Sequence, residues 1–379
     1  MRGNIQERGP RPRALVVLLL LLGFQLGALV APAHACGCGA MVPDRNASIS
    51  VGRETSVVDW DGRTEQIVMR FTVTSDTPRA AWIMPVPGRA TVDLADGALF
   101  DELVRIAAPE YRERHYFWPR GNDWPFDDVD GAGAAPPGAA ARDDGVGVVG
   151  RERLGDFDVA RLTATDPDAL GDWLDENGFE MPAGLTGDLE PYVERGWEYV
   201  AVRLAPREEG AVLTGTLDPL RLRFASDELV YPMRLSRRAD TAQALGLFVL
   251  ADHRMEPRSA IGGSEPEVTY AGRVTSPGGE LGRLTGGKER FLTVLDQEFP
   301  DPSRINGDHE LRAAAEDTPF RRVVWDDDLL TLGGVPVWLL TFVAVAAGAS
   351  AAVLRGVRAR RRGRPVEPPA PMRVPPRVP

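Results

Sequence analysis

Alternation of apolar and polar residues predicts strands in the first part of the chain. The stretch "SVVDWDGRTEQIVMRFTVTSD" at 56–76 alternates on both sides of Asp61-Gly62, a dipeptide that favours a tight turn because glycine accepts a positive φ. This pattern predicts a β-hairpin. A further strand is predicted by "AAWIMPVPG" at 80–88, which ends on prolines that a central strand does not tolerate.

Helical spacing predicts a short helix in "DGALFDELVRIAAP" at 96–109. Asp96 is placed to cap its start and Pro109 to end it. The spacing puts five apolar side chains on one face of this helix: Leu99, Phe100, Leu103, Val104 and Ala107.

The second half of the chain repeats this mixture of strands and helices. A strand in "FDVARLTA" precedes a helix that starts at Asp166-Pro167 and stops at Asn177-Gly178, and a short helix in "PYVERG" precedes the strand "WEYVAVRLA". The helix that starts at Asp166-Pro167 is expected to bury Leu170, Trp173 and Leu174. The stretch "PLRLRFASDELVYPMRLS" predicts a second hairpin, and "LGLFVLADHRM" predicts a more fully buried strand.

These elements together predict an α+β fold of two lobes, built from mostly antiparallel strands with a few short helices. The separator is "DDVDGAGAAPPGAAARDDGVGVVG", because Gly, Ala, Pro and Asp cannot build a core. We therefore expect a first lobe at 36–126, a linker at 127–150 and a second lobe at 151–330.

The N-terminal 35 residues have the three parts of a secretory signal peptide. An arginine-rich start is followed by an apolar run from Ala14 to Val30 and by "AHA", the small-residue pattern at which signal peptidase cleaves. We expect cleavage after Ala35, with an uncleaved N-terminal anchor as the alternative. Either outcome exports the middle of the chain.

A second apolar segment, "VPVWLLTFVAVAAGASAAVL" at 335–354, predicts one transmembrane helix because it contains no charge and is long enough to cross a bilayer. It is followed by "RGVRARRRGR", and positive charge stays on the cytoplasmic side. We therefore expect a single-pass protein of the cell membrane whose helix at 335–354 crosses the lipid bilayer. The ectodomain then lies outside, and the basic, proline-rich tail at 355–379 lies in the cytoplasm.

Composition and charge limit the classes of partner that we expect for the exported part. The chain has 379 residues and a net charge of −11, and both of its ends are basic, so the middle is more acidic than the whole. An acidic surface repels phosphate backbones, and nucleic acid is therefore not an expected partner.

The chain has two cysteines, Cys36 and Cys38, with one glycine between them. An oxidising exterior favours a disulfide, which Gly37 makes sterically easier. Two thiolates could instead hold copper or zinc with further ligands from the fold or from a second chain. Lipidation of Cys36 fits less well, because Ala33 stands where an aliphatic residue is needed. A disulfide, a redox or metal site, and a lipid anchor all stay open.

Other chemical motifs are weak. His115, His253 and His309 are not at metal-ligand spacing, and surface or packing roles are favoured for them. The acidic runs at 127–131 and 326–328 lack the pattern of an EF-hand loop, so solvated loops are favoured over calcium sites. Paired carboxylates are too abundant to indicate a hydrolase.

Several motifs together resemble a bacterial family, domain of unknown function 2330. They are "ACGCG", "MPVPG", "LFDELVRIAAPE", "DPDALGDWLDENGFEMP", "PYVERGWEYVAVRL", "LRLRFASDELVYPMRLS" and "FLTVLDQEFPDPSRI", in this order. The resemblance implies an exported protein, often with a C-terminal membrane segment, and implies no activity.

We therefore expect a membrane-anchored extracytoplasmic protein of the bacterial cell envelope that binds an unidentified protein or envelope partner without catalysis. The alternative is an extracytoplasmic redox or metal-binding protein, or a hydrolase, that uses Cys36 and Cys38. The cofactor, if the protein uses one, stays unknown from the sequence.

Overall fold

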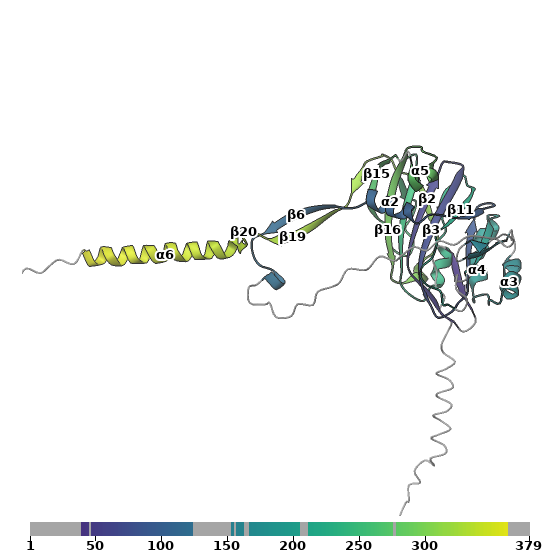
Figure 1. Ribbon diagram of the computed structural model, residues 1–379, viewed down its shortest axis with the longest axis horizontal. Coiled ribbons are helices and arrows are strands. Elements are labelled where there is room, and N and C mark those ends of the chain that lie inside the picture. Colours follow the sequence, from purple (N-terminus) through teal and green to yellow (C-terminus); the bar gives the residue numbers. More distant parts are fainter. Residues whose placement is uncertain are drawn as a thin grey trace, which may run out of the picture. The chain divides into compact units, whose positions relative to one another are not determined.

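The computed structural model describes residues 39–44, 47–123, 153–154, 157–162, 167–204, 211–275 and 278–362 (Figure 1). It divides into two compact units, Met1–Glu110 with Asp144–Arg322, and Tyr111–Asp143 with Val323–Pro379. The expected signal peptide at 1–35, the linker at 127–150 and residues 363–379 of the tail lie outside the described residues.

A five-stranded antiparallel sheet forms one layer of the first unit. Its order is β1 (Ala40–Pro43), β4 (Ala80–Val86), β9 (Glu198–Leu204), β8 (Phe157–Leu162) and β7 (Arg153–Leu154). Pro85 lies inside β4 rather than after it, opposite Tyr199 of β9. A proline is tolerated there because the described pairing with β1 ends at Ile83, two residues earlier.

A nine-stranded sheet forms the next layer. Eight strands follow the order β18 (Phe320–Arg321), β15 (Glu267–Val274), β16 (Arg290–Phe299), β13 (Gln243–Ala251), β2 (Ile49–Trp60), β3 (Thr64–Ser75), β11 (Leu220–Ala225) and β5 (Thr91–Leu94), and β10 (Thr214–Thr216) pairs with β3. Its neighbours are antiparallel except for β2 and β13, which run parallel. The mostly antiparallel α+β prediction is thereby confirmed.

Apolar side chains fill three separate cores, which gives this unit four layers. One core lies between the two sheets and includes Phe71, Trp82 and Leu247. The second packs the other face of the five-stranded sheet against α3 (Pro167–Glu176) and α4 (Leu185–Glu194). The third packs the other face of the nine-stranded sheet against α2 (Ala98–Ile106) and α5 (Gly279–Thr285).

Strands from both sides of residues 127–150 share these sheets. β4 pairs with β9, β3 with β11, and β2 with β13. The two expected lobes are therefore joined by backbone hydrogen bonds of the same sheets.

The first predicted hairpin is confirmed. β2 and β3 pair antiparallel from Ile49 opposite Ser75 to Trp60 opposite Glu65, and Gly62 in the turn has a φ of 87°. A residue with a side chain would be strained in that conformation.

The second predicted hairpin is wrong. β11 pairs with β3 and β5, whereas β12 (Leu229–Tyr231) belongs to a three-stranded sheet in which β17 (His309–Ala313) lies between β12 and β14 (Met255–Pro257). Alternation placed Leu220, Leu222 and Phe224 correctly in the core. It could not identify the partner strand, because many strands offer a matching apolar face.

Helix α2 buries Leu99, Phe100 and Leu103 as predicted, but Val104 is 53% exposed. Its start lies one residue later than expected, with Gly97 at the cap position and Asp96 Oδ1 accepting a hydrogen bond from the Ala98 amide at 2.9 Å. The short 3₁₀ helices η2 (Arg234–Arg238) and η3 (Pro302–Arg304) complete this unit.

The second unit contains two short strand pairs and the C-terminal helix. β6 (Glu110–Tyr116), whose first residue ends the first unit, pairs with β19 (Val323–Leu329), η1 is Gly121–Asp123, β20 (Thr331–Leu332) pairs with β21 (Val335–Pro336), and α6 is Val337–Arg362. α6 is long and apolar enough to cross a membrane, as the sequence predicted. It starts two residues later than 335 and continues through the arginines, which are good helix formers.

Candidate functional site

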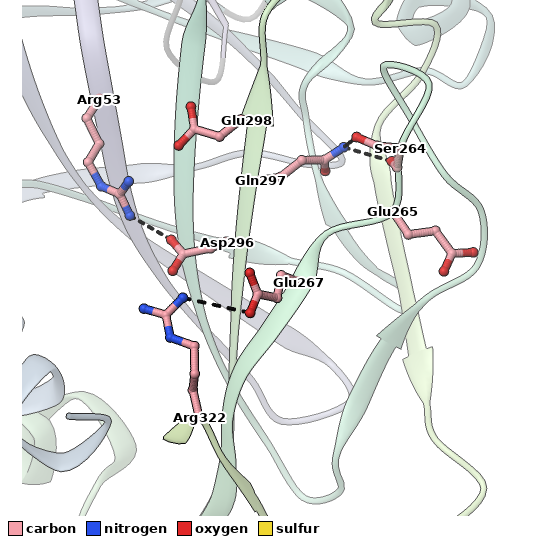
Figure 2. A pocket seen from close by; sticks show the side chains of 8 residues that line it. All are labelled: Arg53, Ser264, Glu265, Glu267, Asp296, Gln297, Glu298 and Arg322. Carbon is pink, nitrogen blue, oxygen red and sulfur yellow. Dashed lines mark hydrogen bonds and ion pairs between the residues drawn. The ribbon is translucent and has the colours of Figure 1, made fainter. Parts of the chain in front are cut away.

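A pocket lies on the nine-stranded sheet, beyond the area that α2 and α5 cover. Its volume is about 510 Å³, and charged side chains from β2, β15 and β16 line it (Figure 2). Asp296 follows the buried Val294 by two positions and Arg53 precedes the buried Val57 by four, so both project from the helix-covered face.

An ion pair crosses the floor of this pocket. Arg53 Nη2 of β2 lies 2.6 Å from Asp296 Oδ1 of β16, although β13 separates the two strands. Gly246 of β13 lies beneath the pair, and a Cβ built there would be 2.9 Å from Arg53 Nη2. The missing side chain of Gly246 is what lets the two charges meet.

A second ion pair borders the pocket. Arg322 Nη1 lies 3.8 Å from Glu267 Oε1 (Figure 2). Gln297 turns away from Asp296 and donates hydrogen bonds of 2.9 Å to the carbonyl oxygens of Ile261 and Ser264, which fixes the loop beside β15.

The charge balance of the pocket is negative. The carboxylates of Glu265, Glu267, Asp296 and Glu298 face two guanidinium groups, those of Arg53 and Arg322. Glu265 and Glu298 are exposed. Such a surface suits a polar ligand with positive charge, and its exposed carboxylates keep their water, which does not favour acid-base catalysis.

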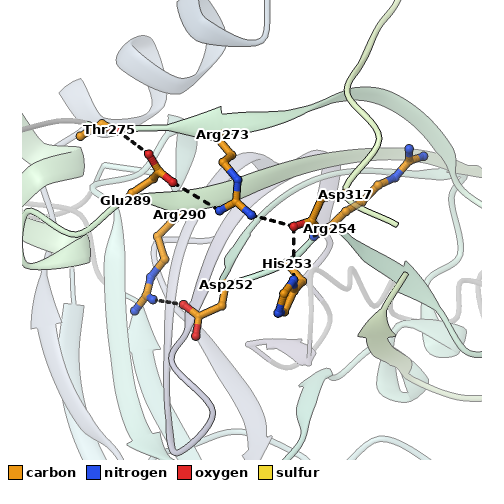
Figure 3. A network of polar contacts seen from close by, with 8 residues as sticks. All are labelled: Asp252, His253, Arg254, Arg273, Thr275, Glu289, Arg290 and Asp317. Carbon is orange, nitrogen blue, oxygen red and sulfur yellow. Dashed lines mark hydrogen bonds and ion pairs between the residues drawn. The ribbon is translucent and has the colours of Figure 1, made fainter. Parts of the chain in front are cut away.

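A network of polar contacts lies elsewhere on the first unit (Figure 3). Asp317 accepts a hydrogen bond from the Arg254 amide at 2.8 Å and from Arg273 Nη2 at 2.7 Å, and it lies 3.2 Å from His253 Nδ1. The Arg254 amide is the main cause that lowers the pKa of Asp317. The contacts of His253 in the described residues reach Asp317 and no hydroxyl, so this pair resembles a clamp rather than a nucleophile-activating dyad.

A buried ion pair lies beside this network. Arg290 Nε lies 3.1 Å from Asp59 Oδ1, and the two side chains are 6% and 5% exposed. Burial raises the pKa of Asp59, and Arg290 offsets part of that effect. Arg290 Nη1 also contacts Asp252 at 2.5 Å, nearer the surface (Figure 3).

Another polar cluster is sealed between the sheets. Tyr231 Oη lies within hydrogen-bonding distance of Glu54 and, at 2.6 Å, of Ser56 Oγ, and all three residues are buried. Because these side chains are almost wholly removed from solvent, we expect them to contribute to packing specificity rather than to a site.

The predicted cysteine site lies outside the described residues, which begin at Gly39, directly after Cys38. Within the described ranges, no group of three His, Cys, Asp or Glu side chains could hold a metal ion. His309 is buried, whereas His115 and His253 are exposed side chains near carboxylates. In the acidic run 326–328, Asp327 accepts two hydrogen bonds from Arg114, at 2.7 and 2.6 Å.

Sequence reasoning did not find the pocket. Arg53 and Asp296 are 243 positions apart, and neither belongs to a motif. One signal was present, because a glycine inside an apolar strand often marks a close approach, and Gly246 interrupts "LGLFVL". The glycine alone does not show which side chains pass over it.

Comparisons with known proteins agree with the motifs. The family described as "Uncharacterized protein conserved in bacteria" (DUF2330) matches residues 32–312, which confirms the resemblance. No curated protein matches the chain. The crystal structure of baculovirus P35 is similar over 74% of this chain and 98% of that chain, with 11% identity and a TM-score of 0.30. A TM-score this low carries no argument about fold or function.

Proposed function

The chain belongs to the DUF2330 family of uncharacterized bacterial proteins, and on that premise we propose that it is a single-pass membrane protein whose α+β unit lies outside the cytoplasm and binds a ligand or envelope partner. The observation that carries the proposal is the exposed apolar surface of α6. An 18-residue window of this helix is 0% buried and has a mean hydropathy of 2.2. A soluble protein would have to leave that surface in water, which is unfavourable.

The orientation follows from charge. The last turns of α6 carry Arg355, Arg358 and the run Arg360–Arg362. Arginine clusters next to a membrane helix stay in the cytoplasm, which supports an orientation with the sheets on the opposite side. The signal peptide expected at 1–35 supports the same orientation.

Protease treatment of intact cells tests the topology. We expect digestion of the sheet-containing unit from outside and protection of an epitope tag placed after Pro379. A control digestion after detergent permeabilisation should remove both. Protection of the sheets in intact cells, or loss of the tag, contradicts the proposed orientation.

We propose the pocket on the nine-stranded sheet as the place where this protein binds a ligand, and that the ligand carries positive charge. The support is its excess of carboxylates and its open, water-accessible lining. Binding rather than catalysis is favoured because the pocket shows no deeply buried acid or base, as general catalysis would need.

Spermidine, a flexible polycation, is a suitable probe for isothermal titration calorimetry with the full chain in detergent. Replacing two pocket carboxylates, Asp296→Asn with Glu298→Gln, should weaken its binding several-fold. Asp175→Asn with Glu176→Gln removes the same charge from exposed positions on α3, which packs on the five-stranded sheet, and is the matched control. Equal binding by both variants would remove this pocket as the cation site.

The alternative is a redox or metal-binding role of Cys36 and Cys38, or a hydrolase that uses them. The supporting observation is the close packing of Gly39, the residue between Cys38 and β1. Gly39 has a φ of 122°, and a Cβ there would be 2.2 Å from the Ile83 carbonyl oxygen. Cys38 directly precedes Gly39 in the chain. The cysteine pair is therefore attached to the folded unit through a residue that packs closely against β4.

A further inference from the structure

β6 and β19 form a parallel ribbon in the second unit. The amide of Glu110 donates to the Arg322 carbonyl at the start of the ribbon, and the amide of Leu330 donates to the Tyr116 carbonyl at its end, both at 2.9 Å. The residue numbers increase together along both strands. The C-terminal ends of β6 and β19 therefore meet.

The far end of this ribbon is hydrogen-bonded to the first residue of α6. Leu330, which binds Tyr116, also accepts a hydrogen bond of 2.9 Å from the amide of Val337. Val337 is the first residue of α6 and of the segment that is long and apolar enough to cross a membrane. The residues directly after Tyr116 are thereby placed beside the start of the apolar helix.

Those residues are two exposed aromatic side chains. Phe117 is 37% and Trp118 64% exposed, and their rings meet edge to face with centroids 5.1 Å apart. Leu332 on β20, five residues before Val337, is 70% exposed. An apolar group of this size in water is unfavourable, so a cover is expected.

The loop that carries Phe117 and Trp118 is closed by polar contacts. Asp123 accepts hydrogen bonds from the Tyr116 hydroxyl and, at 2.9 Å, from the Arg120 amide. The Arg120 guanidinium stacks on the Tyr116 ring at 4.5 Å. A loop fixed in this way presents its aromatic pair without a further cost in chain entropy.

We propose that Phe117 and Trp118 insert into the lipid-water interface of the outer leaflet, so that the ribbon stands on the membrane at a second point beside α6. The inference rests on the proposed membrane function of α6. The interface is the favoured cover because the hydrogen bonds from Tyr116 through Leu330 to Val337 hold the aromatic pair close to the start of α6, where the helix would enter the bilayer. Aromatic rings with a polar edge also concentrate at that depth.

Spin labelling of the full chain in phosphatidylethanolamine and phosphatidylglycerol vesicles tests this placement. In a Cys36→Ser, Cys38→Ser background, single labels are introduced by Trp118→Cys, by Tyr111→Cys and by Ala347→Cys. Tyr111 is the matched control, because it is an exposed aromatic at the other end of β6, about 20 Å away along an extended strand. Ala347 lies within the apolar helix.

Power saturation then compares oxygen with a water-soluble nickel chelate. We expect a several-fold higher oxygen-to-nickel accessibility ratio at 118 than at 111, and the highest ratio at 347. A ratio at 118 equal to that at 111, with 347 still in the bilayer, overturns the inference and leaves the anchor intact. A water-accessible 347 overturns the anchor and the inference together.

A second measurement keeps the native cysteines. The chain is labelled with 5-fluorotryptophan, and the Trp118→Phe variant assigns the Trp118 resonance. Gadolinium chelated to lipid headgroups should broaden that resonance and leave the buried Trp82 sharp. If the Trp118 resonance stays as sharp as that of Trp82, the aromatic pair does not reach the lipid headgroups and the lipid proposal is wrong.

Discussion

Arg53 and Asp296 meet across an intervening strand. Their side chains come from β2 and β16, and the 2.6 Å contact between Nη2 and Oδ1 passes over Gly246 of β13. The two side chains are 51% and 32% exposed. The pair therefore shapes the pocket floor more than it stabilises the fold, because exposed ion pairs contribute about 0–1 kcal/mol.

Gly246→Ala should move Arg53 at little cost. The added Cβ would meet the far end of a flexible side chain, so the free energy of unfolding in urea should fall by less than about 1 kcal/mol. Gly39→Ala is the contrasting variant, since its Cβ would lie 2.2 Å from a backbone oxygen at a φ of 122°. It should cost several times more, and equal losses for the two variants would show that the contact over Gly246 is not adjustable.

Local pattern predicted much of this fold. Asp61-Gly62 marked the first turn, and Leu170 and Leu174 marked the buried face of α3, because both signals depend on neighbours in sequence. The partner of β11 was not predictable, since its alternation fits any apolar sheet face. Val104 was placed in the core because the spacing of an amphipathic helix does not show how wide its covered stripe is.

The pocket depends on contacts between residues that lie far apart in the sequence, and local patterns do not predict such contacts. Arg53, Gly246 and Asp296 lie on three strands whose adjacency is set by the order β16-β13-β2. The apolar C-terminal helix was predictable for the opposite reason. Its signal is a continuous apolar run, and no tertiary partner is needed to define it.

Removing one partner of the buried ion pair should be costly. Arg290→Leu leaves Asp59 buried without its cation, and such a change destabilises by about 3–5 kcal/mol. The double variant Arg290→Leu, Asp59→Leu should recover part of the loss, which a double-mutant cycle measures by urea unfolding. Arg273→Leu, at the exposed pair with Asp317, is the control and should cost less than about 1 kcal/mol. If Arg290→Leu lowers the free energy of unfolding no more than Arg273→Leu does, Asp59 does not depend on Arg290 as its buried counter-ion.

Cys36 and Cys38 should be the first and third residues of the mature chain and should be joined to each other. Intact mass of the purified protein should match cleavage after Ala35 and should rise by about 2 Da on reduction, since a disulfide holds two fewer hydrogens. Metal analysis of the same sample decides the alternative. Bound copper or zinc that is lost in Cys36→Ser would show a metal site in place of the disulfide. An added lipid mass on Cys36 would show lipidation and would exclude both a disulfide and a metal site at this pair.

His309 should make the protein sensitive to mild acid. Burial lowers its pKa from 6.5 to about 4, and the unfolded chain therefore binds a proton more readily than the native one between those values. The free energy of unfolding should fall by about 3 kcal/mol as pH drops from about 6.5 to about 4. His309→Gln should remove this part of the acid dependence, whereas His115→Gln, at an exposed histidine, should keep it. Parallel curves for the wild type and His309→Gln would contradict the buried, neutral imidazole.

Glu65 should act in the opposite direction. It is fully buried in β3, and neither carboxylate oxygen has a hydrogen-bond partner among the described residues. Burial raises its pKa well above the ordinary value, and the backbone amide of Val230, which lies near the carboxylate without meeting hydrogen-bond geometry, offsets only part of this. The native state therefore retains a proton that the unfolded chain releases above about pH 4.3, so stability falls as pH rises from there toward the raised native pKa.

Glu65→Gln separates this effect from the rest of the titration. Glutamine keeps the shape of the protonated acid without its charge, so the variant should match the wild type in acid and exceed it in urea stability at alkaline pH. Glu298→Gln, an exposed carboxylate on the same sheet, is the control and should leave the pH curve unchanged. If Glu65→Gln is less stable than the wild type at alkaline pH, Glu65 is ionised in the native state, and a cation or bound water must reach it between the two sheets.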